Sequence, residues 1–261
     1  MTATDTPITA AGSTAPRTVH VEHCMGTAFT IDIRDPGSWD AAIAEVVGWL
    51  HRVDAVFSTY RADSDISRIQ RGELTVANAD PEVDAVLELC ARAATATAGA
   101  FTAMPHGRLD PTGLVKGWAV ERASRLLEAR GAVNHAVNGG GDVQLAGGAT
   151  PGRPWVVGIS DPGNRSRILS TVTGRNFAVA TSGIAERGSH IRDPFTGRPA
   201  VALASATVVG DRLSLADAYA TAAFVLGQQA IRWIEEVDGY AALLVDPDGS
   251  ISTSRDWRTE R

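Results

Sequence analysis

The sequence predicts an α+β fold in which mostly antiparallel, mixed sheets are flanked by helices. Two observations lead to this class. Strand-like and helix-like patterns both recur but do not alternate as β–α–β units, and strand pairs stand near both ends of the chain. No internal repeat occurs, and the glycine-rich span 138–154 is the one candidate seam. We therefore expect residues 1–17, rich in Thr, Ala, Ser and Pro, to be a disordered tail and residues 18–261 to form a single domain.

The chain begins with a strand pair and continues with helices. Alternating apolar residues predict two strands within residues 19–34, with a kink at Met25-Gly26-Thr27 between them. Apolar residues three and four apart then predict a helix from Trp39 to about Tyr60, for which Ser38 is the expected cap. A short helix is expected after Ser64.

Two further helices are predicted before the middle of the chain. Asp80-Pro81 opens a helix over residues 82–97, because aspartate caps helices well and proline fits the first helical position. Gly99 ends it. Asp110 to Gly113 is expected to form a turn, and a helix follows over residues 114–130.

The second half of the chain is richer in strands. A helix capped by Ser214 is predicted over residues 215–226, and residues 229–237 also have a helical pattern. Residues 240–245 and 251–253 are expected to form a hairpin. Further strands are predicted at 136–138, 143–145, 155–160, 169–173, 178–181 and 205–209.

Composition and charge exclude several classes of protein. The 261 residues carry 24 Lys+Arg and 30 Asp+Glu, a formal net charge of -6. An acidic chain without a basic run is a poor nucleic-acid binder, and no apolar stretch is long enough to predict a membrane span. The N-terminus lacks the basic and apolar regions of a signal peptide. Together with two isolated cysteines, Cys24 and Cys90, this predicts a cytoplasmic protein in which both thiols fill space in the core.

The segment Asp110-Pro-Thr-Gly-Leu-Val-Lys-Gly117 contains the one lysine among the 24 cationic side chains. A helix start offers free N–H groups and partial positive charge, which suit a phosphate, and a lysine adds a point charge. The alternative is a helix that Asp110 caps and that carries a surface lysine.

Asp217 and Thr221 lie four residues apart in a predicted helix, so both oxygens face the same side. Both are ligands that Mg²⁺ or Ca²⁺ accepts. The alternative is a helix whose polar face happens to hold these two residues. Apolar neighbours at 222–226 indicate that the helix is buried, and a buried aspartate needs a partner, which favours a ligand role.

Two other segments are candidates for chemistry. Asn138-Gly-Gly-Gly-Asp142 follows a strand and could approach a phosphate, although glycines packed tightly against other backbone explain it equally well. His190 lies in a polar, turn-rich segment where it could reach a ligand, or it could be an ordinary surface residue. Together these motifs predict a metal-assisted site for a ligand that carries phosphate.

Seven motifs, taken in order, resemble those of the FAD:protein FMN transferases, the ApbE family. The resemblance covers residues from about 18 to 250. The motifs are Met25-Gly-Thr27, Ser58 to Arg68 (STYRADSDISR), Asp110 to Gly117, Asn138 to Asp142, Thr181-Ser-Gly183, His190 to Pro194 (HIRDP) and Ala216 to Thr221 (ADAYAT).

The resemblance implies a T-fold-like α+β architecture and an enzyme that binds FAD and Mg²⁺. Such enzymes transfer the FMN half of FAD to a Thr or Ser hydroxyl of a target flavoprotein through a phosphoester bond and release AMP. By matching position, the residues expected to contact FAD are Met25, Tyr60, Ala100, Phe101, Thr102, Asp110, Lys116 and Arg192. The Gly113 carbonyl, Asp217 and Thr221 are expected to hold Mg²⁺, and His190 falls at the position of the catalytic histidine.

The chain departs from the family pattern in two places. Thr102 stands where the family usually has aspartate, in a shortened segment before Asp110, and Ala220 stands where many members have a second aspartate. With one carboxylate fewer, Mg²⁺ would bind more weakly or keep more water ligands. Two alternatives stand beside the transferase. One is an Mg²⁺-dependent pyrophosphatase that splits FAD into FMN and AMP at the same site; the other, which the two departures motivate, is an FAD-binding protein without catalytic activity.

Overall fold

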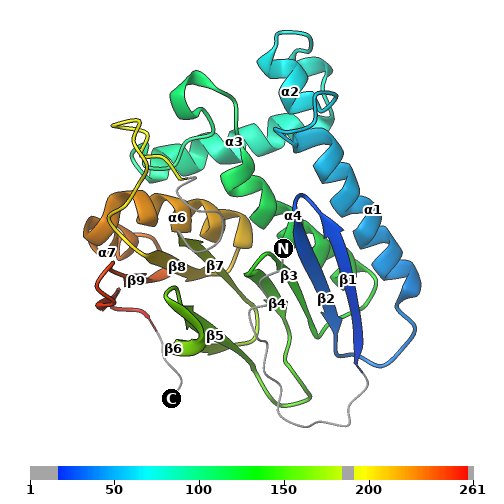
Figure 1. The fold of residues 1–261 in the computed structure, drawn as a ribbon. Helices are drawn as coiled ribbons and strands as arrows, with labels where there is room; N and C mark the ends of the chain where they lie inside the picture. The colour runs from blue at the N-terminus through cyan, green and yellow to red at the C-terminus, as the bar shows by residue number, and fades with distance from the viewer. Residues whose placement is uncertain (1–16, 184–190, 258–261) are drawn as a thin grey trace.

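The main feature of the fold is an eight-stranded sheet that contains strands from both ends of the chain (Figure 1). The computed structural model describes residues 17–183 and 191–257, so all but the last residue of the expected N-terminal tail lie outside it. The strand order is β1-β2-β3-β4-β7-β8-β9-β10, and every pairing between these strands is antiparallel. The strands are β1 (Thr18–Cys24), β2 (Thr27–Ile33), β3 (His135–Gly139), β4 (Asp142–Ala146), β7 (Phe177–Gly183), β8 (Ser205–Gly210), β9 (Ala241–Val245) and β10 (Ile251–Thr253).

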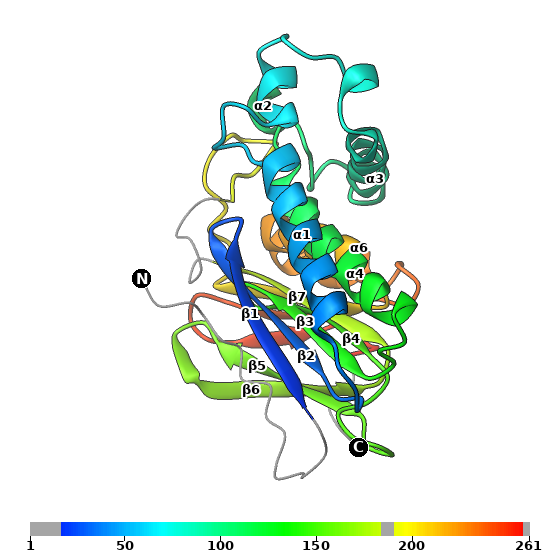
Figure 2. The same cartoon turned by 90° about the vertical axis from the view of Figure 1, so that its right-hand side faces the viewer.

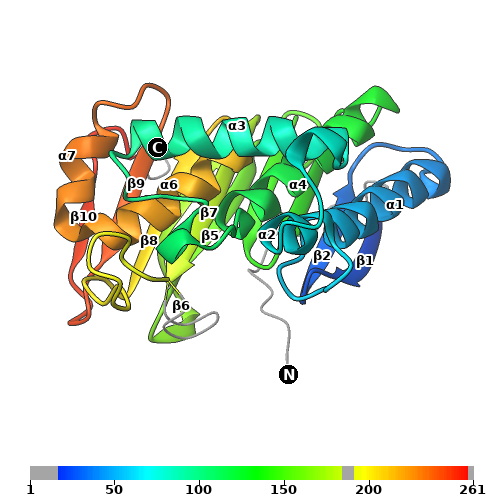
Figure 3. The same ribbon diagram turned by 90° about the horizontal axis from the view of Figure 1, so that it is seen from above.

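Helices cover one face of this sheet, and a two-stranded ribbon covers part of the other face (Figure 2). The ribbon consists of β5 (Trp155–Asp161) and β6 (Asn164–Gly174). The helices are α1 (Asp40–Phe57), α2 (Asp65–Gln70), α3 (Pro81–Ala96), α4 (Thr112–Ala129), α6 (Leu213–Leu226) and α7 (Ala230–Ile234), with 3₁₀ turns at Val76–Asn78, Pro105–Gly107 and Gly227–Gln229. Seen from above, α4 and α6 lie over the middle of the sheet (Figure 3). None of these helices is both long and apolar enough to cross a bilayer.

Alternation along the central strands builds two apolar cores. In β7, Ala178 and Ala180 face the helices, whereas Val179 faces the ribbon. The ribbon contributes Trp155 and Val157 to the second core. Because successive side chains of a strand point to opposite faces, strands buried on both sides are apolar throughout their length. The predicted α+β class with antiparallel sheets is confirmed.

Two predicted helix caps are wrong. Ser38 precedes α1 by two residues, and the N-cap position belongs to Trp39, whose indole nitrogen donates to the Asp35 carbonyl at 3.1 Å. Ser214 lies inside α6, which begins at Leu213. The first N–H groups of α6 are satisfied by side chains remote in sequence, because Leu213 N donates to Gln144 (3.0 Å) and Ser214 N donates to Glu121 (3.0 Å). A capping group supplied by tertiary structure leaves no local sequence signal.

The glycine run after β3 is a tight turn and not a domain seam. Gly140 and Gly141, with φ of 60° and 100°, join β3 to β4 in the middle of the main sheet. Two positive φ values in a two-residue hairpin loop are the conformation that favours glycine. A Cβ at Gly139 would lie 2.6 Å from the Phe29 ring, so this glycine is required by close packing.

Buried His135 makes the stability of the fold depend on pH. Its Nδ1 lies 2.9 Å from the Ala132 carbonyl and its Nε2 lies 2.7 Å from Ser124 Oγ. A carbonyl only accepts, so Nδ1 carries the proton and Nε2 accepts from the serine hydroxyl. Burial, opposed in part by these hydrogen bonds, lowers the pKa of His135 from 6.5 to about 4.

The free energy of unfolding is expected to decrease as the pH falls from about 6.5 to about 4, because the unfolded chain takes up this proton first. The loss is on the order of 3 kcal/mol. Urea unfolding at pH 7, 5.5 and 4.5 measures it, and His135→Gln, which cannot take up the proton, should depend less on pH. Equal pH dependence in the two proteins would show that His135 is not the cause.

Candidate functional site

Helices α4 and α6 pack against each other at a glycine. Gly117 N donates to Asp217 Oδ2 at 2.9 Å, in the buried contact between the helices. A Cβ at Gly117 would lie 2.5 Å from the Leu213 carbonyl oxygen and 2.8 Å from Asp217 Cβ. The close approach therefore requires glycine, and it orients the Asp217 carboxylate toward the start of α4.

Gly117→Ala is expected to destabilise the fold by about 2 kcal/mol, because the added methyl group would push α6 away from α4. Gly48→Ala is the matched control, since Gly48 also lies inside a helix and a Cβ there would meet nothing within 4 Å. That control should be neutral or slightly stabilising. Thermal and urea unfolding compare the two variants, and equal effects would contradict the close packing at Gly117.

A cluster of charges lies beside this helix contact. Lys116 Nζ forms an ion pair with Asp142 Oδ2 and lies 4.0 Å from Asp217 Oδ1. The Asp142 side chain is fully buried (0% exposed), whereas that of Lys116 is 21% exposed. The second oxygen of Asp142 accepts from Thr181 N at 2.8 Å. The side chain of Lys116, on α4, thus contacts Asp142 at the start of β4, and Asp142 is in turn bonded to the end of β7.

Two hydroxyl groups and the backbone at Gly113 lie close together near this cluster. Ser182 Oγ lies 3.3 Å from Thr221 Oγ1. A Cβ at Gly113 would lie 3.7 Å from Thr221 Oγ1 and 3.3 Å from the Phe101 ring, so the first turn of α4 lies against Thr221. Asp217 and Thr221 are one helical turn apart on α6. The structure therefore brings together all three residues expected to hold a metal.

The segment before α4 is fixed by side chains. Asp110 Oδ1 accepts from Thr112 N at 3.1 Å and from Thr112 Oγ1 at 2.6 Å, and Leu109 N donates to Gln70. The helix begins at Thr112, two residues before the predicted start, because Asp110 and Pro111 already supply the turn and the N-cap position. Gly113 consequently lies in the first helical turn and not in the preceding loop.

Buried Ala100 and Phe101 lie under this helix start. Each is 2% exposed, and the Phe101 ring packs toward Gly113. Thr102 Oγ1 accepts from Met104 N at 3.0 Å, which orders the shortened segment before Asp110. The Phe101 side chain therefore supports the start of α4.

The other residues expected to contact FAD are Met25, Tyr60 and Arg192, which we call the rim of the site. Met25, with φ of 49°, lies in the turn between β1 and β2. This turn and the β3–β4 turn lie at the same end of their strands, since Gly140 N donates to the Ala28 carbonyl at 3.1 Å. Tyr60 is 93% exposed. Arg192 is exposed and donates to the Gly197 carbonyl at 3.1 Å. Among the described residues, no hydrogen bond or ion pair joins these three side chains to Lys116, Asp142 or Asp217.

The Arg192 loop packs on the segment that precedes α4. A Cβ at Gly99 would lie 3.7 Å from the Phe195 ring, and one at Gly197 would lie 3.1 Å from the His106 ring. Residues 191–200 therefore lie over residues 99–107, close to the start of α4. His190, the expected catalytic residue, lies outside the described residues.

The sequence motifs contain Asp142 and Ser182, but the sequence pattern alone does not predict which side chains these two residues contact. Asp142 is 26 positions from Lys116 in the sequence, and Ser182 is 39 positions from Thr221. The only signals were a glycine hairpin that ends in aspartate and a Thr-Ser-Gly triplet that ends a strand. Their partners follow from the strand order, which places β4 beside β7 under α4 and α6.

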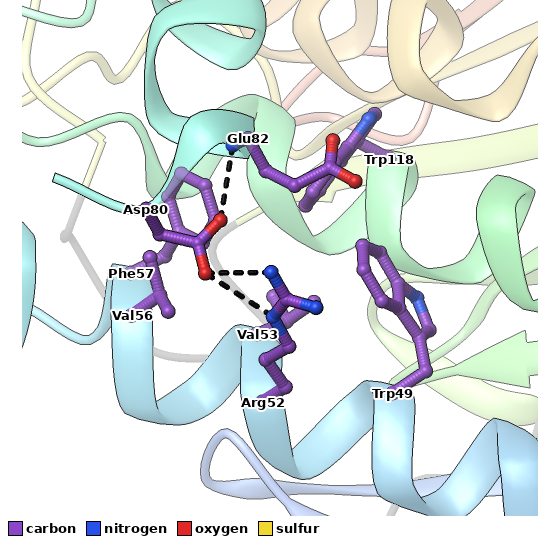
Figure 4. Close-up of a pocket in the computed structure, with 8 residues that line it drawn as sticks. All are labelled: Trp49, Arg52, Val53, Val56, Phe57, Asp80, Glu82 and Trp118. Carbon is purple, nitrogen blue, oxygen red and sulfur yellow. Dashed lines mark hydrogen bonds and ion pairs between the residues drawn. The ribbon is translucent and has the colours of Figure 1, made fainter. Parts of the chain in front are cut away.

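A separate depression lies between α1, α4 and the start of α3 (Figure 4). Its volume is about 140 Å³, and none of the residues expected to bind FAD or metal lines it. The Arg52–Asp80 ion pair (2.8 Å) lies across it, beside Trp49 and Trp118 (Figure 4). The depression is shallow and has no enclosed space, so a dinucleotide does not fit here.

The donor set at the α4–α6 contact fits a hard cation. Among the described residues, no group of three or more His, Cys, Asp or Glu side chains could hold a metal. One carboxylate, one hydroxyl and one backbone carbonyl are instead available from Asp217, Thr221 and Gly113. Mg²⁺ commonly binds in this way, with one or two carboxylates, retained waters and oxygens from a phosphate ligand.

Comparison with known proteins shows which family and which relatives this chain is similar to. The family model described as "ApbE family" matches residues 25–104 and 102–244. A protein of Rhodobacter capsulatus named FAD:protein FMN transferase is 29% identical over 86% of this chain and 42% of its own length. Proteins of the same name from Vibrio cholerae and Escherichia coli are each 30% identical, over 54% and 56% of this chain and 46% and 44% of their own length. The chain thus aligns with less than half the length of these relatives.

Solved structures share the fold. The flavin transferase ApbE from Vibrio cholerae superposes with a TM-score of 0.78 at 24% identity, over 92% of this chain and 98% of that one. The ApbE protein from Thermotoga maritima gives a TM-score of 0.81 at 24% identity, over 92% and 97%. At this level of identity the superpositions show a common α+β architecture.

Proposed function

The chain belongs to the ApbE family, and we propose that it transfers the FMN half of FAD to a Thr or Ser hydroxyl of a target flavoprotein, with release of AMP. One observation carries the proposal: Gly113, Asp217 and Thr221 meet beside the ammonium group of Lys116, at the first turn of α4. Cleavage of a diphosphate needs positive charge at the phosphates and fixed positions more than covalent chemistry. Relatives named FAD:protein FMN transferase support the choice of substrate.

We assign the diphosphate of FAD to the start of α4. The N–H groups of the first helical turn attract phosphate, and Lys116 adds a localised positive charge one turn further along. Asp110 holds this turn through Thr112. Residues 100–102 are assigned to the same part of the site, because the Phe101 ring lies against Gly113 in the first turn of α4.

We assign the rings of FAD to the rim residues Tyr60 and Met25. Tyr60 offers an exposed aromatic face, and Met25 offers a polarisable thioether in the β1–β2 turn, which lies beside the β3–β4 turn. Arg192, exposed on the loop that covers residues 99–107, is assigned to the polar groups of FAD.

Mg²⁺ would be held by the Gly113 carbonyl, the Asp217 carboxylate and the Thr221 hydroxyl. When bound, it neutralises phosphate charge as a Lewis acid. Ala220 is fully buried in α6 and provides no second carboxylate. The chain's own contribution is therefore one charged ligand, which Gly117 N orients, and two neutral oxygens.

The transfer itself needs an acceptor for one proton. The acceptor hydroxyl oxygen attacks the phosphorus of the FMN half, the bond from that phosphorus to the oxygen shared with AMP breaks, and AMP leaves with this oxygen. We assign the hydroxyl proton to the His190 imidazole, because imidazole is the side chain most often used as a general base near neutral pH. The position of His190 in this role comes from the sequence motif.

We further propose that residues 18–261 act as one domain with the acceptor flavoprotein as partner. Strands β1 and β10 form the two edges of the same sheet, which supports the single domain. A cytoplasmic site of action is part of this proposal, and the two free thiols, Cys24 and Cys90, fit a reducing compartment.

The products formed from FAD test the proposed function. Protein, FAD and Mg²⁺ are incubated with and without a candidate acceptor flavoprotein, and AMP and FMN are separated by chromatography. Release of AMP that depends on the acceptor, without free FMN, supports transfer. Equal release of AMP and free FMN without acceptor would establish a pyrophosphatase, and tight FAD binding with neither product would establish a binding protein.

Lys116→Arg is expected to weaken FAD binding about tenfold, because a longer planar guanidinium cannot occupy the position of a compact ammonium beside fully buried Asp142. Fluorescence titration with FAD measures the affinity. Arg122→Lys, an exchange of the same two residue types at an exposed site on α4, should leave affinity unchanged. Unchanged affinity and turnover in Lys116→Arg would mean that the lone lysine has no special role.

A further inference from the structure

Lys116 lies between two buried carboxylates that differ in their partners. Its ammonium forms an ion pair with Asp142 Oδ2 and lies 4.0 Å from Asp217 Oδ1. Asp142 has no exposed side-chain surface, and its other oxygen accepts from Thr181 N at 2.8 Å. Asp217 accepts from Gly117 N at 2.9 Å. Both carboxylates are thus fixed by backbone N–H groups, and the ammonium is the group that can shift between them.

This arrangement has a consequence for a metal at Asp217. An ammonium group and a divalent cation compete for the same carboxylate, and they repel each other at a few ångströms. The flexible four-carbon stem of a lysine lets its ammonium move, and Asp217 Oδ1 lies only 4.0 Å from Lys116 Nζ. A second anion is needed to hold the ammonium away from the metal ligand.

We infer that Asp142 is a positioning residue: it retains the ammonium of Lys116 and thereby leaves the Asp217 carboxylate to the metal. The inference rests on the metal site of the proposed function and goes beyond it, because it assigns Asp142 an effect on metal affinity through Lys116. Asp142 is not itself a metal ligand in this account. The lysine stays close enough to act on a phosphate without displacing the cation.

Asp142→Asn removes this function with little change in shape. The aspartate uses one oxygen for Thr181 N and the other for Lys116. An asparagine has one oxygen, which can continue to accept from Thr181 N, and its NH₂ group then faces the ammonium. Two donors cannot pair, so Lys116 turns to Asp217.

The test is a double-mutant cycle read by metal binding in the absence of FAD. Mn²⁺ serves as the probe, and electron paramagnetic resonance measures the free ion. Asp142→Asn is expected to raise the Kd for Mn²⁺ about tenfold. In a Lys116→Gln background, where no ammonium competes, the same substitution should change the Kd less than about twofold.

The cycle separates the inference from its alternatives. Equal weakening in both backgrounds would mean that Asp142 acts on the metal directly, and no weakening in either would mean that it has no part in metal binding; both results overturn the inference. Failure of the unmodified chain to bind Mn²⁺ would overturn it together with the metal site. Lys116→Met repeats the cycle with a side chain that cannot donate to Asp142, and circular dichroism confirms that each variant is folded.

Asp32→Asn is the matched control. Asp32 is also fully buried and ion-paired, to Arg17 and Arg34, but it lies on the ribbon side of β2, away from α4 and α6. This variant should lose stability and keep its Mn²⁺ affinity within about twofold. A chain that shows the coupled cycle but transfers no FMN would retain this inference and refute the proposed reaction.

Discussion

Replacing Asp217 with asparagine is expected to lower the rate of FMN transfer about a thousandfold while the chain remains folded. Asp217 is the only carboxylate among the three residues assigned to Mg²⁺. The substitution removes its charge but keeps an oxygen that can accept from Gly117 N, so the contact between α4 and α6 is preserved. The loss should therefore appear in turnover and Mg²⁺ dependence and not in the melting temperature.

Asp211→Asn is a suitable control for this experiment. Asp211 precedes α6, is exposed, and accepts from the Tyr240 hydroxyl at 2.9 Å, remote from Thr221 and Gly113 in the fold. It should retain transfer within about twofold, as surface substitutions usually do. An Asp217→Asn enzyme that keeps more than about a tenth of the original rate would contradict a metal-assisted reaction at this place.

His190→Ala is expected to reduce transfer by about 10²- to 10⁴-fold and to leave FAD affinity nearly unchanged. The reason is that a general base takes its proton in the reaction step and adds little to the binding of FAD. Initial rates of AMP release with acceptor present, together with FAD titrations, separate the two quantities. His51→Ala, at an exposed histidine of α1 bonded to Glu22 (2.9 Å), is the control.

If His190→Ala transferred FMN at the original rate, another group would have to take the hydroxyl proton. If it lost FAD binding in parallel with activity, His190 would contribute to the binding site and not act as the base. Both outcomes would leave the role of Asp217 untouched, so the two variants test independent parts of the mechanism.

Most of the fold could be predicted because its elements follow simple periodicity. The buried positions of α1 recur at three- and four-residue spacing, and Asp80 caps α3 as expected by accepting from Glu82 N at 3.0 Å. Strand β6 was predicted too short, at 169–173 in place of Asn164–Gly174. Its first five residues are exposed, so they carry no alternation between buried and exposed positions.

The site could be predicted only in part. The spacing of Asp217 and Thr221 on one helix predicted two neighbouring oxygens, the family resemblance named Gly113 beside them, and the structure has Gly113 next to Thr221. The role of Asp142 depends on a hairpin and on the order of strands β4 and β7, which no local pattern reveals. Phe101, expected to contact FAD, has its side chain buried against Gly113, a contact between segments that no local pattern reveals.

The geometry of the site explains why a lysine, and not an arginine, stands at position 116. Arginine supplies the other 23 of the 24 cationic side chains, yet the position between two buried carboxylates is occupied by lysine. A compact ammonium can be held by one carboxylate oxygen, whereas a guanidinium would span both acids and block the metal ligand. The retained lysine is therefore consistent with a site that must hold two cations at once.

The most direct test of the proposed function is mass spectrometry of the acceptor. The chain is incubated with FAD, Mg²⁺ and a candidate acceptor flavoprotein, and the acceptor is then digested and sequenced by fragmentation. The account predicts a mass increase of one FMN less one water on a single Thr or Ser, formed in step with AMP and absent without Mg²⁺ or with Asp217→Asn. Consumption of FAD to free FMN and AMP, with the acceptor unmodified, would contradict it.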